Sequence, residues 1–341
     1  MSRVLEYDVG AAVASERFGV ETLLPPGVTP AMRLREGLKI DVIELDEEKI
    51  IFDFVGADVS LANALRRIML AEVPTMAIET VYIWDNSSLL HDEVLAHRLG
   101  LVPLNADPDK FDFLDGPDDQ PTDQNTLVFR IDARCGNRPP EGETDQSDPR
   151  WRRDPDAPYT RHIYSSCFEW VPQGNQRERL GEVGPVHDDI LLAKLRPGQR
   201  IQLEMHCRKG TGKDHAKFQP VATASYRLLP KVTLQPAAQA LPNEKKEALV
   251  DQCPMNVLDI EDGDLIAARP RDCTMCRECV RKEEHQGMVT LSRVADHFIF
   301  SVETVGAIAP EAIVKKAIEV LKEKCKGTLE DIGEYMESTG R

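Results

Sequence analysis

The sequence of 341 residues lacks both long apolar runs and a signal peptide. No stretch approaches the roughly 18 consecutive apolar residues that would indicate a membrane-spanning helix. The first ten residues carry acidic side chains and no apolar core segment, which argues against a secretory signal peptide. We therefore expect a soluble protein of a reducing compartment, in which its eight cysteines bind metal or remain free thiols.

Basic residues are fewer than acidic residues. The chain has 42 lysines and arginines against 58 aspartates and glutamates, and its formal net charge is −16. Affinity for nucleic acid depends mostly on basic side chains that neutralise phosphates, and an acidic surface repels them. We predict that the chain does not bind DNA by itself and that any work on DNA is done through partners.

Periodicity predicts an ordered N-terminal part after an irregular arm. Residues 1–36 contain three prolines and no sustained pattern, so we expect an extended arm. A helix is expected that Asp58 or Ser60 can cap and that Pro74 stops, because proline cannot donate the backbone hydrogen bond of a helix interior. The other elements expected here are strands at 39–45, 50–55 and 76–84 and a short helix at 92–99.

The rest of the chain predicts a β-rich middle followed by strands and a helix. Residues 105–123 and 136–158 are irregular and are expected to form loops. Ala295 and Asp296 are expected to turn a hairpin, and a helix is expected from Pro310 to Gly327. The strands predicted from alternating apolar residues are 126–133, 162–171, 200–207, 220–229, 287–294 and 297–304.

Together these elements predict an α+β fold built from remote segments, because strands and a helix occur at both ends of the chain. Residues 37–86 and 287–335 are expected to form one α/β domain. Residues 87–286 are expected to form an inserted, β-rich domain.

Three motifs carry a family resemblance. They are SLANALRRIMLAEVPTMAIET at 60–80, HDEVLAHRLGLVP at 91–103 and GKDHAKFQPV at 212–221. In this order the chain resembles the alpha-like assembly subunits of RNA polymerases, the family of the bacterial alpha protein and its archaeal D-type counterpart. Residues 104–134 contain no cysteine, whereas the RNA polymerase II counterpart carries a cysteine-rich zinc loop there. The resemblance is therefore to the form shared by eukaryotic RNA polymerases I and III.

The resemblance implies a non-catalytic assembly subunit with an RNA polymerase alpha N-terminal-like fold, that is, a discontinuous dimerisation domain with an insert. Its partners would be a smaller alpha-like subunit, in a heterodimer, and the two largest catalytic subunits with the rest of the core. Such a complex makes rRNA, 5S rRNA and tRNA in the nucleus, including the nucleolus, and no catalytic residue is expected in this chain. The alternatives are the archaeal D-type form, an RNA polymerase II counterpart and, more remotely, a ferredoxin-like redox protein.

The predicted dimer interface lies on two helices. Small residues in the first helix permit close approach of another helix, and arginine is common at protein interfaces. An ordinary core helix with solvated arginines would have the same pattern, and it is the resemblance that implies pairing. The residues expected at the interface are Leu61, Ala64, Leu65, Arg66, Ile68, Met69, Val314, Ile318 and Leu321.

Four cysteines form the candidate metal site. Cys253 precedes a proline, and Cys273, Cys276 and Cys279 follow in a C-x-x-C-x-x-C pattern within a ferredoxin-like subdomain at 252–282. This pattern is typical of a 4Fe-4S or 3Fe-4S cluster, and zinc is less favoured because it more often takes two separated pairs. An empty structural subdomain is the open alternative. The remaining cysteines, at 135, 167, 207 and 325, are expected to be small buried apolar residues.

Overall fold

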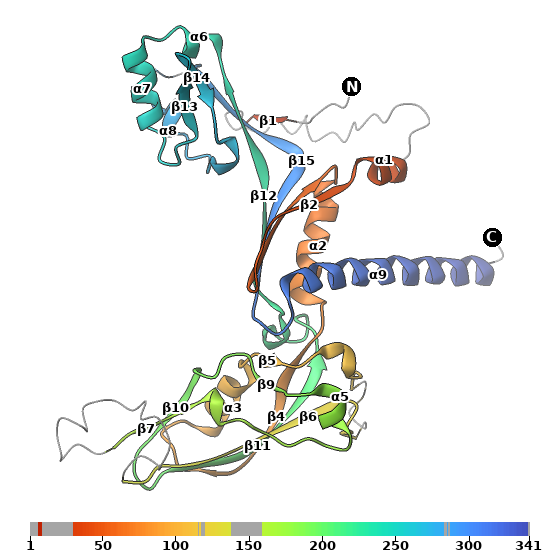
Figure 1. Cartoon of the computed structure of the whole chain (residues 1–341). Helices are drawn as coiled ribbons and strands as arrows, with labels where there is room; N and C mark the ends of the chain where they lie inside the picture. The colour runs from red at the N-terminus through yellow and green to blue at the C-terminus, as the bar shows by residue number, and fades with distance from the viewer. Residues whose placement is uncertain are drawn as a thin grey trace. The chain divides into compact units, whose positions relative to one another are not determined.

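The computed structural model describes residues 6–8, 30–114, 116, 120–137, 159–282, 285 and 287–339 (Figure 1). Most of the predicted N-terminal arm and most of the predicted loop at 136–158 lie outside these residues. The chain divides into two compact units, which are described separately. The first comprises Met1–Leu45, Ile50–Ala64 and Ser225–Ser301, and the second comprises Asp46–Lys49, Leu65–Ala224 and Val302–Arg341.

A five-stranded sheet forms the first unit. Its strands follow the order β1-β15-β3-β2, and β12 also pairs with β15. Strand β2 is therefore an edge strand, antiparallel to β3, with Asp41 opposite Asp53. The bounds are β1 Glu6–Asp8, α1 Pro30–Gly37, β2 Lys39–Leu45, β3 Lys49–Val55, β12 Val221–Leu234 and β15 Val289–Thr304, and helix α2, Val59–Ala71, begins here.

Aromatic side chains build the core of this sheet. Successive residues of a strand point to opposite faces, so Phe52 and Phe54 share one face of β3. The rings of Phe52 and Phe300 stack with their centroids 5.0 Å apart, and Tyr226 meets Phe298 edge-on at 5.3 Å. The opposite face of β3 carries Ile51 and the buried Asp53.

A small module in the first unit holds the four clustered cysteines. Its core contains Leu249, Leu258 and Leu265, and it also takes in Val289 and Leu291 from the beginning of β15. Helices and short strands surround this core: α6 Pro236–Gln239, α7 Asn243–Asp251, β13 Leu258–Glu261, β14 Asp264–Ala267, η5 Pro270–Asp272 and α8 Glu278–Arg281.

The second unit is built around a four-stranded sheet in the order β4-β11-β6-β8. Two further pairs, β10 with β7 and β5 with β9, complete its strands. The bounds are β4 Thr75–Asn86, α3 Asp92–Gly100, β5 Leu104–Asn105, η2 Pro108–Lys110, β6 Thr126–Arg134, β7 Arg161–Tyr164, η3 Ser165–Cys167, β8 Glu169–Trp170, α5 Gln176–Leu180, β9 Gly184–Pro185, β10 Leu191–Leu195, β11 Arg200–Gly210, η4 Ala216–Phe218 and α9 Pro310–Thr339.

Strand β11 shows why this sheet is stable. Every second residue from Ile201 to Cys207 is buried, as the alternating sequence predicts. Three polar residues of the strand are paired: Glu204 accepts from Arg130 at 2.7 Å and lies 2.9 Å from His206, and Arg200 bonds Asp132 at 2.6 Å. Within the part of the chain described, no helix is long and apolar enough to cross a membrane.

Four predictions about local structure were wrong. The predicted hairpin at 287–304 is the single strand β15, because Ala295 and Asp296 accept an extended backbone and β15 has neighbours on both sides. The predicted strand at 162–171 is interrupted by η3, where the hydroxyl of Ser165 donates to the carbonyl of His187. Helix α1 occupies part of the predicted arm. Helix α9 continues past Gly327, because a glycine in a helix interior costs only roughly 1 kcal/mol and does not by itself end a helix.

Candidate functional site

The first and third sequence motifs meet at the end of helix α2. The N–H of Lys213 donates to the carbonyl of Ala71 at 2.8 Å. A side chain at Gly212 would place its Cβ 2.3 Å from the carbonyl oxygen of Leu70, so this close approach requires glycine. The hydroxyl of Thr75 donates to the carbonyl of Phe218 at 2.8 Å, and both residues are buried. The motif at 212–221 is thus fastened to the turn between α2 and β4.

The second motif lies beside Lys217 of the third motif, close to the start of β4. The ammonium group of Lys217 donates to the carbonyl of Ile78 at 2.8 Å and pairs with Glu79, and only 13% of its side chain is exposed. A Cβ on Gly100, at the end of α3, would lie 3.4 Å from that same Ile78 carbonyl. Lys217 of the third motif therefore pairs within the chain, with a residue of the first motif.

Several polar groups at this junction bond to backbone or contact one another. Arg98 donates to the carbonyl oxygens of Leu192 and Leu191 at 3.1 and 2.7 Å. His97 and His215 approach edge-on, with ring centroids 6.5 Å apart. Side chains committed to such bonds suit an architectural role better than acid–base chemistry.

The residues expected at a dimer interface differ in how much surface they keep in the single chain. Leu65, Ile68 and Met69 are buried, so their packing within the chain accounts for them without a partner. Ile318 is 41% exposed, and it lies on α9 with Val314. Leu61, Ala64, Arg66, Val314 and Leu321 are half-buried. The surface that remains for a partner is therefore richest along α9, and the interface itself stays a prediction.

The four clustered cysteines line one small cavity. Cys253 follows the end of α7, Cys273 and Cys276 lie between η5 and α8, and Cys279 lies in α8. The backbone N–H of Val257 donates to the sulfur of Cys253 at 3.4 Å, a bond also found to sulfur ligands of iron–sulfur clusters. Thiols alone are a donor set that suits iron–sulfur clusters or zinc. Within the described residues, however, no three His, Cys, Asp or Glu side chains are arranged to hold a metal ion.

The cysteine loop has unusual backbone conformations and raised thiol pKa values. Met275 and Arg277 adopt left-handed conformations, with φ of 60° and 65°, which cost roughly 1–2 kcal/mol each outside glycine. Burial raises the pKa of the Cys279 thiol to about 11, and the neighbouring thiols act in the same direction. Burial likewise raises the pKa of Cys273. Ligation would therefore have to release protons, because the thiolate is the form that binds metal.

The other four cysteines only partly match expectation. Cys135 and Cys207 are buried, as predicted, and burial raises the pKa of both thiols. Cys167 is half-buried, and Cys325 is exposed on α9, so the prediction of a buried apolar residue was wrong for Cys325. None of the described residues buries Cys325 on this helix.

A buried ion network ties the cysteine module to the sheet, and the sequence analysis missed it. Arg271, in η5, donates from both terminal nitrogens to the Asp53 carboxylate at 2.8 and 2.7 Å, and His297 lies 3.0 Å from that carboxylate. Burial raises the pKa of Asp53, but the bonds from Arg271 and His297 outweigh it and hold that pKa below its ordinary value. The available signal was a lone carboxylate between two phenylalanines in an apolar strand.

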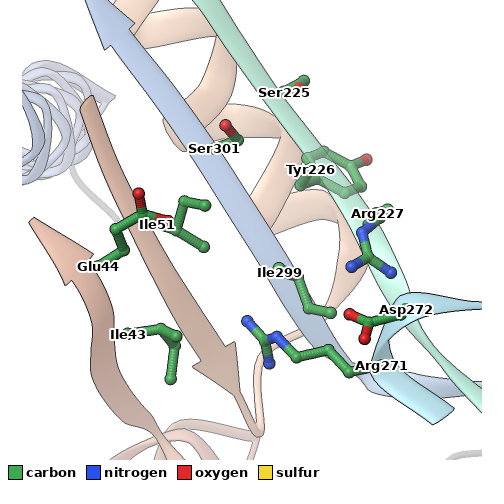
Figure 2. Close-up of a pocket in the computed structure, with 10 residues that line it drawn as sticks. All are labelled: Ile43, Glu44, Ile51, Ser225, Tyr226, Arg227, Arg271, Asp272, Ile299 and Ser301. Carbon is green, nitrogen blue, oxygen red and sulfur yellow. The ribbon is translucent and has the colours of Figure 1, made fainter. Parts of the chain in front are cut away.

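Next to this network lies a pocket on the sheet face opposite the phenylalanine core. Figure 2 shows Arg271 reaching across it toward β2 and β3, with Asp272 beside Arg227. Its floor is apolar. The residues that line it are Ile43, Glu44, Ile51, Ser225, Tyr226, Arg227, Arg271, Asp272, Ile299 and Ser301.

Comparison with known families identifies the architecture. The model of the RNA polymerase Rpb3/Rpb11 dimerisation domain matches residues 51–325. The chain belongs to this family. The Rpb3/Rpb11 match includes α2, the three motifs and the first half of α9, and the mixed α/β structure with several small sheets is consistent with it. The family resemblance inferred from the motifs is confirmed.

Relatives within the Rpb3/Rpb11 family extend over nearly the whole chain. The DNA-directed RNA polymerases I and III subunit RPAC1 of Homo sapiens is 46% identical over 306 residues, covering 88% of this chain and 86% of its own. The RPAC1 subunit of Saccharomyces cerevisiae is 41% identical over 304 residues, with coverages of 86% and 87%. The archaeal DNA-directed RNA polymerase subunit Rpo3 of Methanosphaera stadtmanae is 31% identical, with coverages of 87% and 99%.

Proposed function

We propose that this chain is a non-catalytic assembly subunit of DNA-directed RNA polymerases I and III. The observation that carries the proposal is the identity of 41–46% with subunits of those two polymerases over 86–88% of the chain. The junction of the three motifs supports it, because its polar side chains bond to backbone of the same chain. The catalytic step would then belong to other subunits of the complex.

The proposed partners are a smaller alpha-like subunit, in a heterodimer, and the two largest catalytic subunits. In this proposal α2 and α9 form the pairing surface, within a discontinuous dimerisation domain that carries the β-rich insert and its ferredoxin-like module. Obligate interfaces of this kind bury more than about 2,000 Å² and are strongly apolar. The subunit would act in the nucleus, including the nucleolus, and would reach DNA only through the complex, in keeping with its net charge of −16.

We also propose that the four clustered thiols can ligate an iron–sulfur cluster when iron and sulfide are supplied. Four sulfur donors around one cavity and the N–H of Val257 directed at Cys253 support this. Bound iron would supply folding energy to the module, because metal binding and folding are coupled. In this proposal the left-handed residues Met275 and Arg277 would shape the loop that brings the thiols to the cluster.

Purification of the complex tests the assembly role. A tagged chain isolated from its native source should bring down subunits specific to RNA polymerase I and to RNA polymerase III, together with the smaller alpha-like subunit. The variant Ile318→Asp should release that small subunit, because it places an unpaired charge on the exposed side of α9. Glu323→Lys, an exposed charge change off the apolar stripe, is the matched control and should retain it. Recovery of RNA polymerase II subunits alone would contradict the proposal.

A further inference from the structure

The pocket beside the Asp53 network has the size of a small-molecule site. Its volume is about 410 Å³, and ligand sites in proteins commonly occupy roughly 300–1,000 Å³. All of its lining residues belong to the first unit of the chain. Ile299 is buried in its floor, whereas Ile43 at its edge remains 54% exposed. The pocket therefore offers apolar surface that a bound molecule would cover.

A β-bulge in strand β2 turns two neighbouring side chains into this pocket. The register of β2 on β3 shifts so that Val42 lies opposite Phe52, whereas Glu44 lies opposite Ile51. In a regular strand Ile43 and Glu44 would point to opposite faces of the sheet, but here both line the pocket. Bulges occur often beside functional sites, where they redirect a side chain. The edge strand thus supplies the pocket with both an apolar contact and a carboxylate.

Two arginines supply hydrogen-bond donors that the chain leaves unused. Asp272 lies beside Arg227 in Figure 2, but within the described residues Arg227 makes no hydrogen bond or ion pair. Arg271 donates to Asp53 from its two terminal nitrogens. A guanidinium group has five N–H donors, so this pair leaves others available for a second acceptor. Because arginine matches the planar geometry of carboxylates, these donors suit a carboxylate ligand.

The charges that line the pocket cancel. Arg227 and Arg271 contribute two positive charges, and Glu44 and Asp272 contribute two negative charges. Figure 2 shows Glu44 on the β2 side of the apolar floor and Arg227 on the β12 side. A simple anion such as phosphate would meet both carboxylates, and a simple cation would meet both arginines. A ligand that carries one charge of each sign at opposite ends matches both sides of the pocket.

The order of the strands requires an extended ligand. Strands β3 and β15 lie between Glu44 on β2 and Arg227 on β12. Three strand spacings separate the backbones of β2 and β12 by about 14 Å. An α-amino acid carries both charges on one carbon, so it is too short to reach both sides. The ring of Tyr226 packs against the phenylalanine core, which leaves no free aromatic face in the pocket for a nucleobase.

We propose that this pocket binds a small, extended zwitterion with an apolar middle, the class of linear ω-amino acids and short apolar peptides. Its ammonium group lies at Glu44, and its carboxylate lies at Arg227 and Arg271. The apolar middle covers Ile299. The inference goes beyond the assembly role and does not depend on it, because every residue that it uses belongs to the first unit of this chain.

Isothermal titration calorimetry of the full chain tests the class of ligand. ε-Aminocaproate should bind at least about tenfold more tightly than caproate or hexylamine, each of which lacks one charged hydrogen-bonding group. It should also exceed norleucine, whose two charges share one carbon. Leucylleucine is the peptide probe, and whichever of the two extended zwitterions binds more tightly identifies the source of the ligand. Equal affinity for all five compounds would overturn the proposal.

Two variants locate the ligand. Arg227→Gln should reduce the affinity for ε-aminocaproate at least about tenfold and leave that for hexylamine unchanged, whereas Glu44→Gln should reduce it and leave that for caproate unchanged. Both residues are exposed, so the variants should fold, and urea denaturation checks this. Arg35→Gln and Glu47→Gln remove exposed charges outside the pocket and are the matched controls. Unchanged affinity in folded Arg227→Gln and Glu44→Gln would contradict the assignment.

The same titration on the intact, tagged polymerase separates a free ligand from a subunit contact. Binding of ε-aminocaproate should persist in the complex. Loss of binding on assembly would mean that side chains of another subunit fill the pocket, and it would overturn the proposal of a free ligand. If the tagged chain recovers no polymerase subunits, the proposed function has failed, and the titrations of the full chain still decide this inference.

Discussion

Strands β11 and β2 differ in their position within a sheet and in the burial of their side chains. Strand β11 is central in its sheet, its apolar side chains are buried, and its intervening charges are paired. Strand β2 is an edge, and all seven of its residues are exposed, including Val42 at 56%. Strand β11 is packed within the single chain, whereas β2 presents apolar surface that the described residues leave uncovered. Stability of the isolated chain should therefore depend on β11 and hardly on β2.

The sharpest test of this comparison is Leu203→Ala against Val42→Ala. Leu203 on β11 is fully buried, so its truncation leaves a cavity and should cost about 3–4 kcal/mol of unfolding free energy. Val42→Ala removes an exposed side chain and should change that free energy by less than about 0.5 kcal/mol. Urea denaturation of the purified chain measures both. Equal losses would mean that β2 is covered in the chain alone.

Asp53 and Asp41 extend the comparison across the β2–β3 pair. Asp53→Asn removes the charge that holds Arg271 and His297, and should cost about 3 kcal/mol, the low end for a broken buried ion pair because Arg271 is partly exposed. The matched control is Asp41→Asn, directly opposite on the exposed edge strand, which should be nearly neutral.

Acid should remove the effect of Asp53→Asn. The pKa of Asp53 in the folded chain lies below its ordinary value of 3.8. Its stabilising contribution is therefore complete above about pH 4 and is lost as the pH falls through the folded pKa. The difference between the wild type and the variant should shrink in that window. A difference that stays constant down to the acid-unfolded state would contradict the assigned network.

The paired charges on the outer face of β11 should matter less. Glu204→Gln weakens the bonds to Arg130 and His206, but the Arg130 side chain is 53% exposed, so the loss should be about 0.5–1 kcal/mol. The loss should fall further in 1 M salt, which screens exposed charges. Thermal unfolding at two salt concentrations checks this, and a salt-independent loss would mean that the pair is effectively buried.

Cys276→Ser should have the smallest effect on global stability, below about 0.5 kcal/mol without iron, because Cys276 is exposed. Its effect should instead be local. After anaerobic reconstitution with iron and sulfide, the wild type should gain bound iron, acid-labile sulfide and visible absorption, and amides of residues 250–285 should exchange more slowly. Cys276→Ser should lose these changes, and the control Cys325→Ser should keep them. Zinc bound without sulfide would contradict a cluster.

The sequence predicted well those elements whose signal is local. The alternation of Ile201, Leu203 and Met205 identified β11, and Pro74 marked the end of α2 within a few residues. The wrong predictions concern elements whose structure depends on more than their local sequence. Ala295 and Asp296 resemble a turn until β1, β3 and β12 are placed beside β15, and Gly327 resembles a helix stop although a glycine in a helix interior costs only roughly 1 kcal/mol.

The candidate site was predictable only as a set of motifs. Their order indicated the family, but the reason that Gly212 is glycine lies in the carbonyl of Leu70, about 140 residues earlier in the chain. The cysteine spacing indicated a metal site or an empty structural subdomain; the four cysteines line one cavity, and ligation itself stays a prediction. The ion network of Asp53 could not be paired from sequence, because its partners, Arg271 and His297, are more than 200 residues away.

Strand β15 limits how the length of this protein can change. Its early residues Val289 and Leu291 belong to the core of the cysteine module, and its later residues Phe298 and Phe300 belong to the core of the sheet. A single residue inserted or deleted between them would turn every later side chain to the opposite face. The two phenylalanines would then leave the core for the face of the pocket. We therefore expect homologous proteins to vary in the loops and to keep the spacing from Leu291 to Phe298 unchanged.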